Sequence, residues 1–142
     1  LDLTFRGPVK TSLGFFAYTH FLKDHPARKN EICFLYFSQH LYWLLSIENP
    51  ISWDFMLPGY HTEAQAYAAT KELQKACPRW IFLDWSVEWV VNPLYSDWPK
   101  IDRALLLNNP LQKFIFANYR LILSSNIFRA YERREKACLA EK

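Results

Sequence analysis

Two short, uninterrupted apolar runs, Ile32–Phe37 and Trp80–Leu83, constrain the fold of this chain more than any other feature. Both contain β-branched and aromatic side chains. An apolar run of about four to eight residues is typical of a strand buried on both faces of a sheet. Asp84 follows the second run directly. The sequence therefore predicts two buried central strands in a sheet that is flanked by helices.

The clearest predicted helix lies between these two runs. Thr62, followed three residues later by Gln65, has the spacing of a capping box, and Glu63 favours the positive end of the helix dipole. Pro78 ends the segment, because proline cannot continue a helix. The apolar stripe of this helix consists of Ala66, Ala69, Leu73 and Ala76.

Weaker signals precede the first apolar run and follow it. Apolar residues at helical spacing occur over Phe15–Leu22 and stop before Pro26, since the residue before a proline avoids the helical region. Ser38 is a candidate cap for a helix over Gln39–Ser46. Residues Arg6–Ser12 are a further candidate strand.

The C-terminal third predicts a helix followed by a hairpin. Asn109 is a candidate cap, and Pro110 occupies the first helical position. Two strand-like segments, Leu121–Leu123 and Ile127–Arg133, flank a turn at Ser124–Asn126. Strands separated by helices favour an α/β fold. We expect a mixed sheet of about four to five strands, with flanking helices and a C-terminal antiparallel hairpin.

The length and composition of the chain are those of one globular domain. Its 142 residues are 51% hydrophobic and 22% charged, and the aromatic share of 18% requires a packed interior or an adhesive surface. The net charge of +3 is too small to imply a nucleic-acid partner. We expect residues 1–142 to form a single soluble domain. Because the chain begins at Leu1 rather than Met, we also expect excision from a longer protein or removal of a leader.

The cysteines do not predict a metal site. Cys33, Cys77 and Cys138 lack the paired spacing of zinc ligands, so we expect no metal and no cofactor. Cys33 lies in an apolar run and is expected to behave as a small buried hydrophobe. A disulfide between Cys33 and Cys77 is an alternative in an oxidising compartment.

Few residues are candidates for catalysis. Asp84 ends an apolar strand, where α/β folds place ligand-binding groups, and it could form an acid/base pair with Glu88. A strand-end carboxylate that caps the next segment is at least as common. His61 would need a carboxylate partner, and a histidine near a helix start is more often structural. Because the chain contains no GxGxxG, P-loop, GxSxG or HExxH motif, we expect no catalytic machinery of its own.

The loop Ile51–His61 is the expected centre of any functional surface. It carries Trp53, Phe55 and Tyr60, and Pro58-Gly59 fixes its shape just before the capped helix. A loop with this many aromatic residues either folds onto the core or presents apolar surface to a partner. We expect Phe55 to point inward and Trp53 to be at least partly exposed.

Several segments form an ordered pattern along the chain. A strand runs into a helix start and is followed by Asn-Pro, by an aspartate with Leu-Pro-Gly-Tyr, by a Thr-Glu-x-Gln helix, by a second strand and by a closing helix and hairpin. These segments are Phe34–Leu45, Glu48–Pro50, Asp54–Tyr60, Thr62–Gln65, Pro78–Asp84, Pro110–Arg120 and Phe128–Arg133. In this order, from about Val9 to Arg134, the chain resembles the C-terminal soluble domain of bacterial protein-mannosyltransferase-like membrane glycosyltransferases. Enzymes of this class have the GT-C architecture and use polyprenyl-phosphate sugars.

The resemblance implies an accessory role for this chain. The catalytic aspartates of the class lie in loops between transmembrane helices, outside this chain, so no catalytic residue is carried over. The resemblance implies a non-catalytic domain on the extracytoplasmic (periplasmic) face of the membrane. Its expected partners are the transmembrane part of the parent enzyme and the lipid-linked sugar or the acceptor. The expected functional surface consists of Trp53, Asp54, Tyr60, His61 and Asp84.

The alternative function belongs to a different class. Asp84, Glu88 and His61 would then serve a free-standing soluble α/β enzyme of the hydrolase type. The sequence encoded upstream separates the two hypotheses, because many apolar spans of about 20 residues would support the membrane enzyme.

Overall fold

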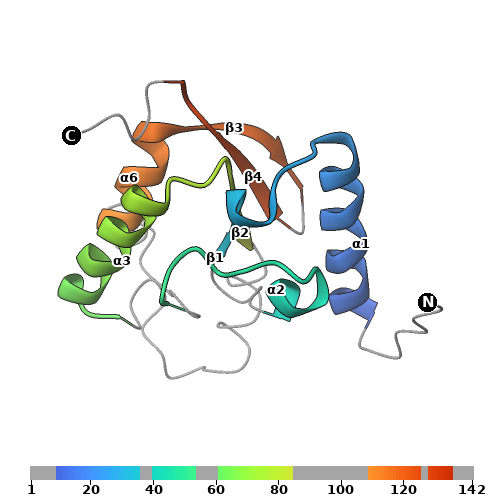
Figure 1. The fold of residues 1–142 in the computed structure, drawn as a ribbon, viewed down its shortest axis with the longest axis horizontal. Helices are drawn as coiled ribbons and strands as arrows, with labels where there is room; N and C mark the ends of the chain where they lie inside the picture. The colour runs from blue at the N-terminus through green and yellow to red at the C-terminus, as the bar shows by residue number, and fades with distance from the viewer. Residues whose placement is uncertain (1–8, 36–39, 54–60, 85–108, 126–127, 136–142) are drawn as a thin grey trace.

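A computed structural model of the chain describes residues 9–35, 40–53, 61–84, 109–125 and 128–135, with the backbone alone for residues 9–15 and for Asp84. The strands form one four-stranded sheet in the order β1-β2-β4-β3 (Figure 1). The elements are α1 (Val9–Asp24), the short 3-10 helix η1 (Lys29–Glu31), β1 (Ile32–Leu35), α2 (His40–Leu44), α3 (Glu63–Ala76), β2 (Trp80–Asp84), α6 (Pro110–Asn118), β3 (Tyr119–Ser124) and β4 (Phe128–Arg133).

The sheet is mixed, which confirms the predicted fold class. Strands β1 and β2 pair in parallel, with Cys33 opposite Ile81. Strand β4 pairs antiparallel with both β2 and β3, and Ile81 faces Tyr131 in the first of these pairings. The C-terminal hairpin predicted from the sequence is therefore present as β3 and β4.

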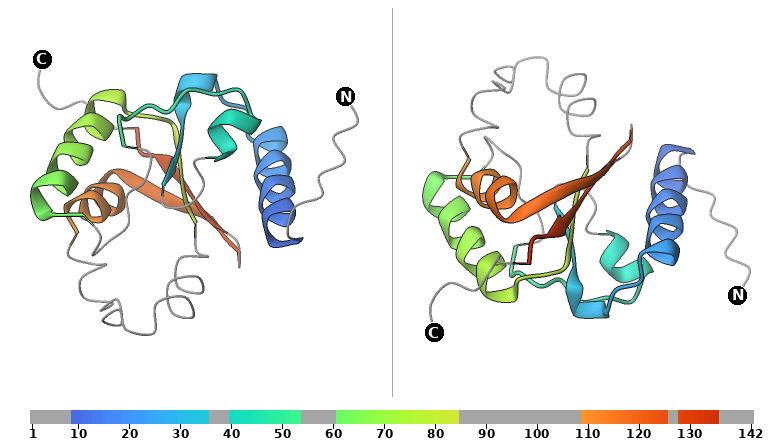
Figure 2. Two further views of the ribbon diagram at one scale, coloured as in Figure 1. Left: turned by 90° about the horizontal axis from the view of Figure 1, so that it is seen from below. Right: turned by 90° about the horizontal axis from the view of Figure 1, so that it is seen from above.

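Helices cover both faces of the sheet. Figure 2 shows α3 and α6 on one side and α1 and α2 on the other. Alternating strand residues supply the two cores, since successive side chains of a strand point to opposite faces. Cys33, Ile81 and Tyr131 belong to the core under α3 and α6. Phe34 and Phe82 belong to the core under α1 and α2.

The core under α1 and α2 contains many of the aromatic residues of the chain. Tyr18 and Phe21 of α1 lie against rings of the sheet, mostly edge to face, which is the arrangement that the ring quadrupole favours. Tyr18 also stacks on Phe128 with ring centroids 4.2 Å apart. An aromatic cluster of this kind favours one packing arrangement of α1 on the sheet.

Strand β1 is buried, as predicted, but its position in the sheet corrects the expectation of two central strands. Among the described strands it lies at an edge, and β2 alone of the two apolar runs is central. The edge is closed by Tyr42 of α2. The backbone N–H of Phe34 donates to the Tyr42 hydroxyl oxygen at 2.7 Å, and the hydroxyl donates to the Phe34 carbonyl at 3.1 Å. One side chain thus provides the hydrogen bonds that a neighbouring strand would supply.

The predicted helix boundaries largely agree with the structure. At the start of α3, the Thr62 hydroxyl accepts from the Gln65 amide and the Gln65 side chain accepts from the Thr62 amide, which confirms the capping box. At the start of α6, the Asn109 side chain accepts from the Leu111 amide. Ala76 is exposed rather than part of the buried stripe, because it lies in the last turn of α3, beyond the core.

One predicted element is wrong. The candidate strand Arg6–Ser12 overlaps helix α1, which begins at Val9. Residues 6–8 lie outside the described part of the chain. The helix that the sequence predicts further along therefore begins earlier, at Val9. Its residues Tyr18 and Phe21 pack on the sheet, and such tertiary packing outweighs a weak local preference for a strand.

The cysteines differ in state. Cys33 is free and buried, and burial raises the pKa of its thiol to about 12 while a hydrogen bond with Tyr42 acts in the opposite direction. Cys77 is disulfide-bonded. The pairing of Cys33 with Cys77 is therefore excluded, and the expectation that Cys33 acts as a small buried hydrophobe is confirmed.

No helix in the described ranges is both long enough and apolar enough to cross a membrane.

Candidate functional site

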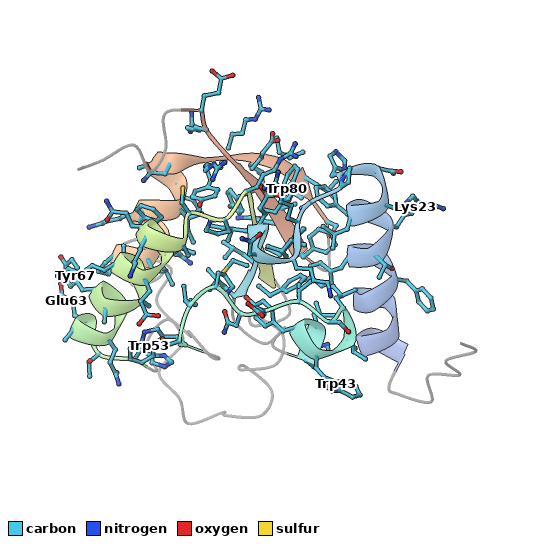
Figure 3. All side chains as sticks on the ribbon, in the orientation of Figure 1. Lys23, Trp43, Trp53, Glu63, Tyr67 and Trp80 are labelled. Carbon is cyan, nitrogen blue, oxygen red and sulfur yellow. The ribbon has the colours of Figure 1, made fainter. Side chains whose placement is uncertain are left out.

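The candidate site lies where α3 begins. Helix α3 leads directly into β2, so it runs back along the sheet and starts at the carboxyl ends of the two parallel strands. This is the end of an α/β sheet where ligands usually bind. Figure 3 places Trp53 at this end, near Glu63 in the first turn of α3.

The segment before the site has a fixed backbone. The side chain of Asn49 accepts from the Ile51 amide at 3.2 Å and donates to the Trp53 carbonyl at 3.2 Å. This is a local side-chain-to-backbone turn of the kind that asparagine favours. Ile51 is buried in the core under α3 and α6, so the segment is fixed both by hydrogen bonds and by packing.

A carboxylate of α3 ties this segment to the helix. The backbone N–H of Ser52 donates to Glu72 Oε2 at 2.6 Å. This bond is the main reason that the pKa of Glu72 is lowered. Desolvation is the next largest effect and acts in the opposite direction, and the Ser52 hydroxyl and the Trp53 side chain lower the pKa by smaller amounts. The lowered pKa favours the ionised form of Glu72, which ties the Ser52 backbone to the helix.

Trp53 and His61 come together at the site. Their ring centroids are 5.9 Å apart and the ring planes are nearly perpendicular, at 85°. Trp53 is half-buried and packs against the core under α3 and α6. Its indole nitrogen is buried without a hydrogen bond of ordinary geometry, so its influence on Glu72 is that of a nearby donor rather than a close partner.

His61 is positioned by the capped start of α3. It directly precedes Thr62, whose reciprocal hydrogen bonds with Gln65 fix the direction in which the chain enters the helix. The imidazole is half-buried. The indole, the imidazole and the anchored carboxylate of Glu72 together make the candidate surface, which has aromatic and ionic components. Aromatic rings of this kind can pack on the apolar face of a ligand while a polar edge remains wet.

The structure brings together two of the five predicted site residues, Trp53 and His61. Partial exposure of Trp53 agrees with the expectation. Asp54 and Tyr60 lie outside the described residues, as does Phe55. Asp84 ends β2, and its backbone faces Phe128 in the sheet, but its side chain is not described.

Sequence reasoning missed two residues that shape the site. Asn49 precedes a proline in a turn-forming position, and that signal could have identified it. Glu72 gave no such signal, since its partner Ser52 is 20 residues away in the sequence.

Within the described ranges, no group of three or more histidine, cysteine, aspartate or glutamate side chains is placed to hold a metal ion.

The Ser52–Glu72 contact predicts a specific pH dependence. The pKa of Glu72 is lowered in the folded chain from an ordinary value near 4.5, so its contribution to stability is present above that value. It is lost as pH falls through the lower folded pKa. Unfolding of wild type and Glu72→Gln in urea should therefore differ most near neutral pH, and the difference should shrink in acid.

The Ser52→Ala variant is the matched control for this prediction. It removes the hydroxyl and retains the backbone N–H that makes the dominant contact. Its acid dependence should stay close to that of the wild type. A Glu72→Gln difference that is the same at every pH would show that the ionised contact does not stabilise the fold.

Comparisons of the chain with protein-family profiles, with curated proteins and with solved structures find no match.

Proposed function

We propose that this chain is a non-catalytic domain on the extracytoplasmic face of a membrane glycosyltransferase that uses polyprenyl-phosphate sugars. In this role it contacts the transmembrane part of the parent enzyme and helps to engage the lipid-linked sugar or the acceptor. The proposal begins with the ordered segments in the sequence, and two features of the fold support it.

The strongest support comes from two sequence segments that carry the resemblance and lie close together in the fold. Glu48–Pro50 and Thr62–Gln65 both carry the pattern, and they are separated in the sequence by the loop that contains Trp53. The side chain of Asn49 binds the Trp53 carbonyl, and Trp53 packs edge to face on His61, directly before Thr62. Two segments that are separate in the sequence therefore lie beside the same aromatic pair, Trp53 and His61.

The disulfide at Cys77 supports an extracytoplasmic location. Disulfides persist in oxidising compartments such as the bacterial periplasm and are rare in the cytosol, where thiols are kept reduced. This argument concerns the compartment and does not depend on the identity of the ligand.

The geometry supports a separate role for each of these residues. Trp53 and His61 present ring surface to a sugar or an acceptor group. Glu72 binds the Ser52 amide and Asn49 binds the Trp53 carbonyl, so both hold this segment in place and neither needs to touch the ligand. The capped start of α3 provides a rigid base, and pre-positioned side chains lose less conformational entropy when a ligand binds.

The Trp53→Ala variant of the parent enzyme, assayed in its native membrane, tests the proposal. An aromatic contact is worth about 0.5–1.5 kcal/mol, so the rate of sugar transfer per unit of enzyme should fall by about twofold to tenfold. Initial rates of transfer from the polyprenyl-phosphate sugar provide the measurement.

The matched control is Trp43→Ala on α2. This tryptophan is 82% exposed and lies on the opposite side of the sheet from α3, so its removal should leave transfer within about twofold. Trp53→Phe keeps part of the packing on the core and separates loss of contact from loss of fold. Equal transfer by wild type and a folded Trp53→Ala variant would contradict the proposed role of this surface.

The hydrolase hypothesis is tested with the isolated chain. If purified protein hydrolyses simple glycosides and Asp84→Asn abolishes that activity, the accessory role is wrong. An upstream coding sequence without apolar spans of about 20 residues would also contradict membrane attachment.

A further inference from the structure

The end of the sheet that lies opposite the candidate site is basic. Strands β1 and β2 begin there and β4 finishes there, and β3 starts beside them, since Tyr119 pairs with Arg133. Figure 3 shows Trp80 at this end, apart from Trp53 at the other. Four arginines lie at these strand ends and define what we call the basic end: Arg79, Arg120, Arg133 and Arg134.

One carboxylate fixes two of these arginines in place. Glu132 of β4 pairs with Arg79 at 3.3 Å and with Arg120 at 2.6 Å. A single carboxylate therefore bridges two guanidinium groups, and the three side chains together keep a net positive charge. Both arginines remain partly open to solvent, at 43% and 63% of their side-chain area.

The other two arginines are held by neutral groups. Arg133 Nη1 donates to the Cys77 carbonyl at 2.6 Å, and Arg134 Nε donates to the Tyr119 carbonyl at 3.3 Å. Both residues are exposed. A carbonyl oxygen positions a guanidinium group without cancelling its charge. Cations that are already positioned lose less conformational entropy when a partner binds.

Charge is distributed unevenly over the described part of the chain. Besides the four arginines, the cations of the basic end are Lys23, Arg28, Lys29 and Lys75, and its carboxylates are Asp24, Glu31, Glu132 and Glu135. Cations therefore outnumber carboxylates at this end. Glu63 and Glu72, by contrast, lie on the part of α3 beside Trp53. A chain with a net charge of only +3 thus presents one strongly positive end.

We propose that the basic end rests on an anionic lipid surface, so that the sheet stands on the membrane and the candidate site is directed away from it. The exposed guanidinium groups are spread over the ends of three strands, which suits a surface of many headgroups better than one enclosed phosphate. Arginine binds phosphate oxygens well, because its planar fork matches their geometry. Charge of the opposite sign on the lipid attracts each cation that comes within a Debye length of the headgroups.

This orientation deepens the proposed function and, in what it says of the acceptor, rests on it. Helix α3 runs from the candidate site to the basic end, and its 14 residues span about 20 Å. Trp53 and His61 then lie about 20 Å from the headgroups, whereas the phosphate of a lipid-linked sugar lies at the membrane surface. The candidate site therefore engages the acceptor rather than the lipid-linked sugar.

Binding of the 142-residue chain to vesicles provides the test. In roughly 0.1 M salt, vesicles of phosphatidylglycerol and phosphatidylcholine should bind the chain at least about tenfold more tightly than vesicles of phosphatidylcholine alone. One cation near an anionic surface strengthens binding about fivefold, so the double variant Arg133→Gln, Arg134→Gln should bind roughly 25-fold more weakly. Co-sedimentation provides the measurement, and circular dichroism verifies that each variant is folded.

Two control variants separate charge from structure. Arg133→Lys with Arg134→Lys keeps both charges and should bind within about threefold of the wild type. Ala64→Glu with Ala68→Glu changes the net charge as much as the glutamine variant does, at exposed positions of α3 far from the basic end. It should change binding by less than about twofold, because the attraction is screened beyond roughly 10 Å.

A lipid-borne quencher tests the orientation. A fluorophore on Asn30→Cys, exposed at the start of β1, should be quenched on the anionic vesicles, and one on Glu63→Cys should not. The labelled wild type provides the background.

The proposal is overturned if the anionic vesicles bind no better than the neutral ones, or if the alanine-to-glutamate control weakens binding as much as the loss of the arginines. Release of the chain by inorganic phosphate at constant ionic strength, or equal quenching at Asn30→Cys and Glu63→Cys, would overturn it as well. None of these measurements involves sugar transfer, so failure here is distinguishable from failure of the Trp53→Ala test.

Discussion

The Ile81→Asp variant is expected to be unfolded at 25 °C and neutral pH. Ile81 is fully buried on β2, where it lies between Cys33 of β1 and Tyr131 of β4. Loss of the buried side chain costs about 2–5 kcal/mol, and burial of an unpaired polar group adds about 1–3 kcal/mol or more. The total stability of a domain of this size is about 5–15 kcal/mol, so the variant loses most or all of it. Near-ultraviolet circular dichroism and urea unfolding provide the measurement.

Two control variants isolate the cause. Ile81→Val keeps the site apolar and should cost only about 1 kcal/mol. Leu121→Asp introduces the same aspartate on an exposed position of the same sheet and should remain folded. A cooperatively folded Ile81→Asp variant would show that β2 is not the centre of the core.

The Tyr42→Phe variant is expected to lose about 2–4 kcal/mol of stability, since each buried backbone group left without a partner costs about 1–3 kcal/mol. The substitution removes one oxygen atom and leaves both the N–H and the carbonyl of Phe34 without their partner. The ring itself stays, so its edge-to-face contact with Phe34, at 5.3 Å between centroids, is retained. Urea unfolding of wild type and variant measures the difference.

Hydrogen exchange at the Phe34 amide distinguishes this cause from a general loss of packing. In Tyr42→Phe, this amide should exchange faster relative to the amides of β2, because it loses its acceptor. Tyr67→Phe is the matched control, because Tyr67 is 53% exposed on α3 and its change should be within about 0.5 kcal/mol. If Tyr42→Phe is as stable as Tyr67→Phe, the hydroxyl does not close the β1 edge.

Signals that act over a few residues could be read directly from the sequence. The capping box of Thr62 and Gln65 and the Asn109-Pro110 start of α6 appear in the structure as predicted. Each of these depends on hydrogen bonds or backbone restrictions within one helical turn. Strand β2 and the hairpin of β3 and β4 were also predicted, since continuous apolar runs and turn residues are local patterns.

The candidate site was predictable only in part, for the same reason. The aromatic loop and the helix start identified Trp53 and His61 as candidates, but nothing in their spacing required the rings to lie 5.9 Å apart. The contact between Ser52 and Glu72 joins residues 20 positions apart and exists only because α3 packs beside the segment.

The sequence by itself determined the types of most elements and the class of the fold, because strand burial and helix caps are encoded by neighbouring residues. The tertiary structure decided which strands lie at the edges of the sheet. It placed β1 at one edge, where Tyr42 satisfies the backbone of Phe34, and it left β3 open at the other. A buried edge strand and a central strand show the same kind of apolar pattern in the sequence. The pattern records that the strand is covered, and it does not record what covers it. Only the packed chain shows whether that cover is another strand or a side chain.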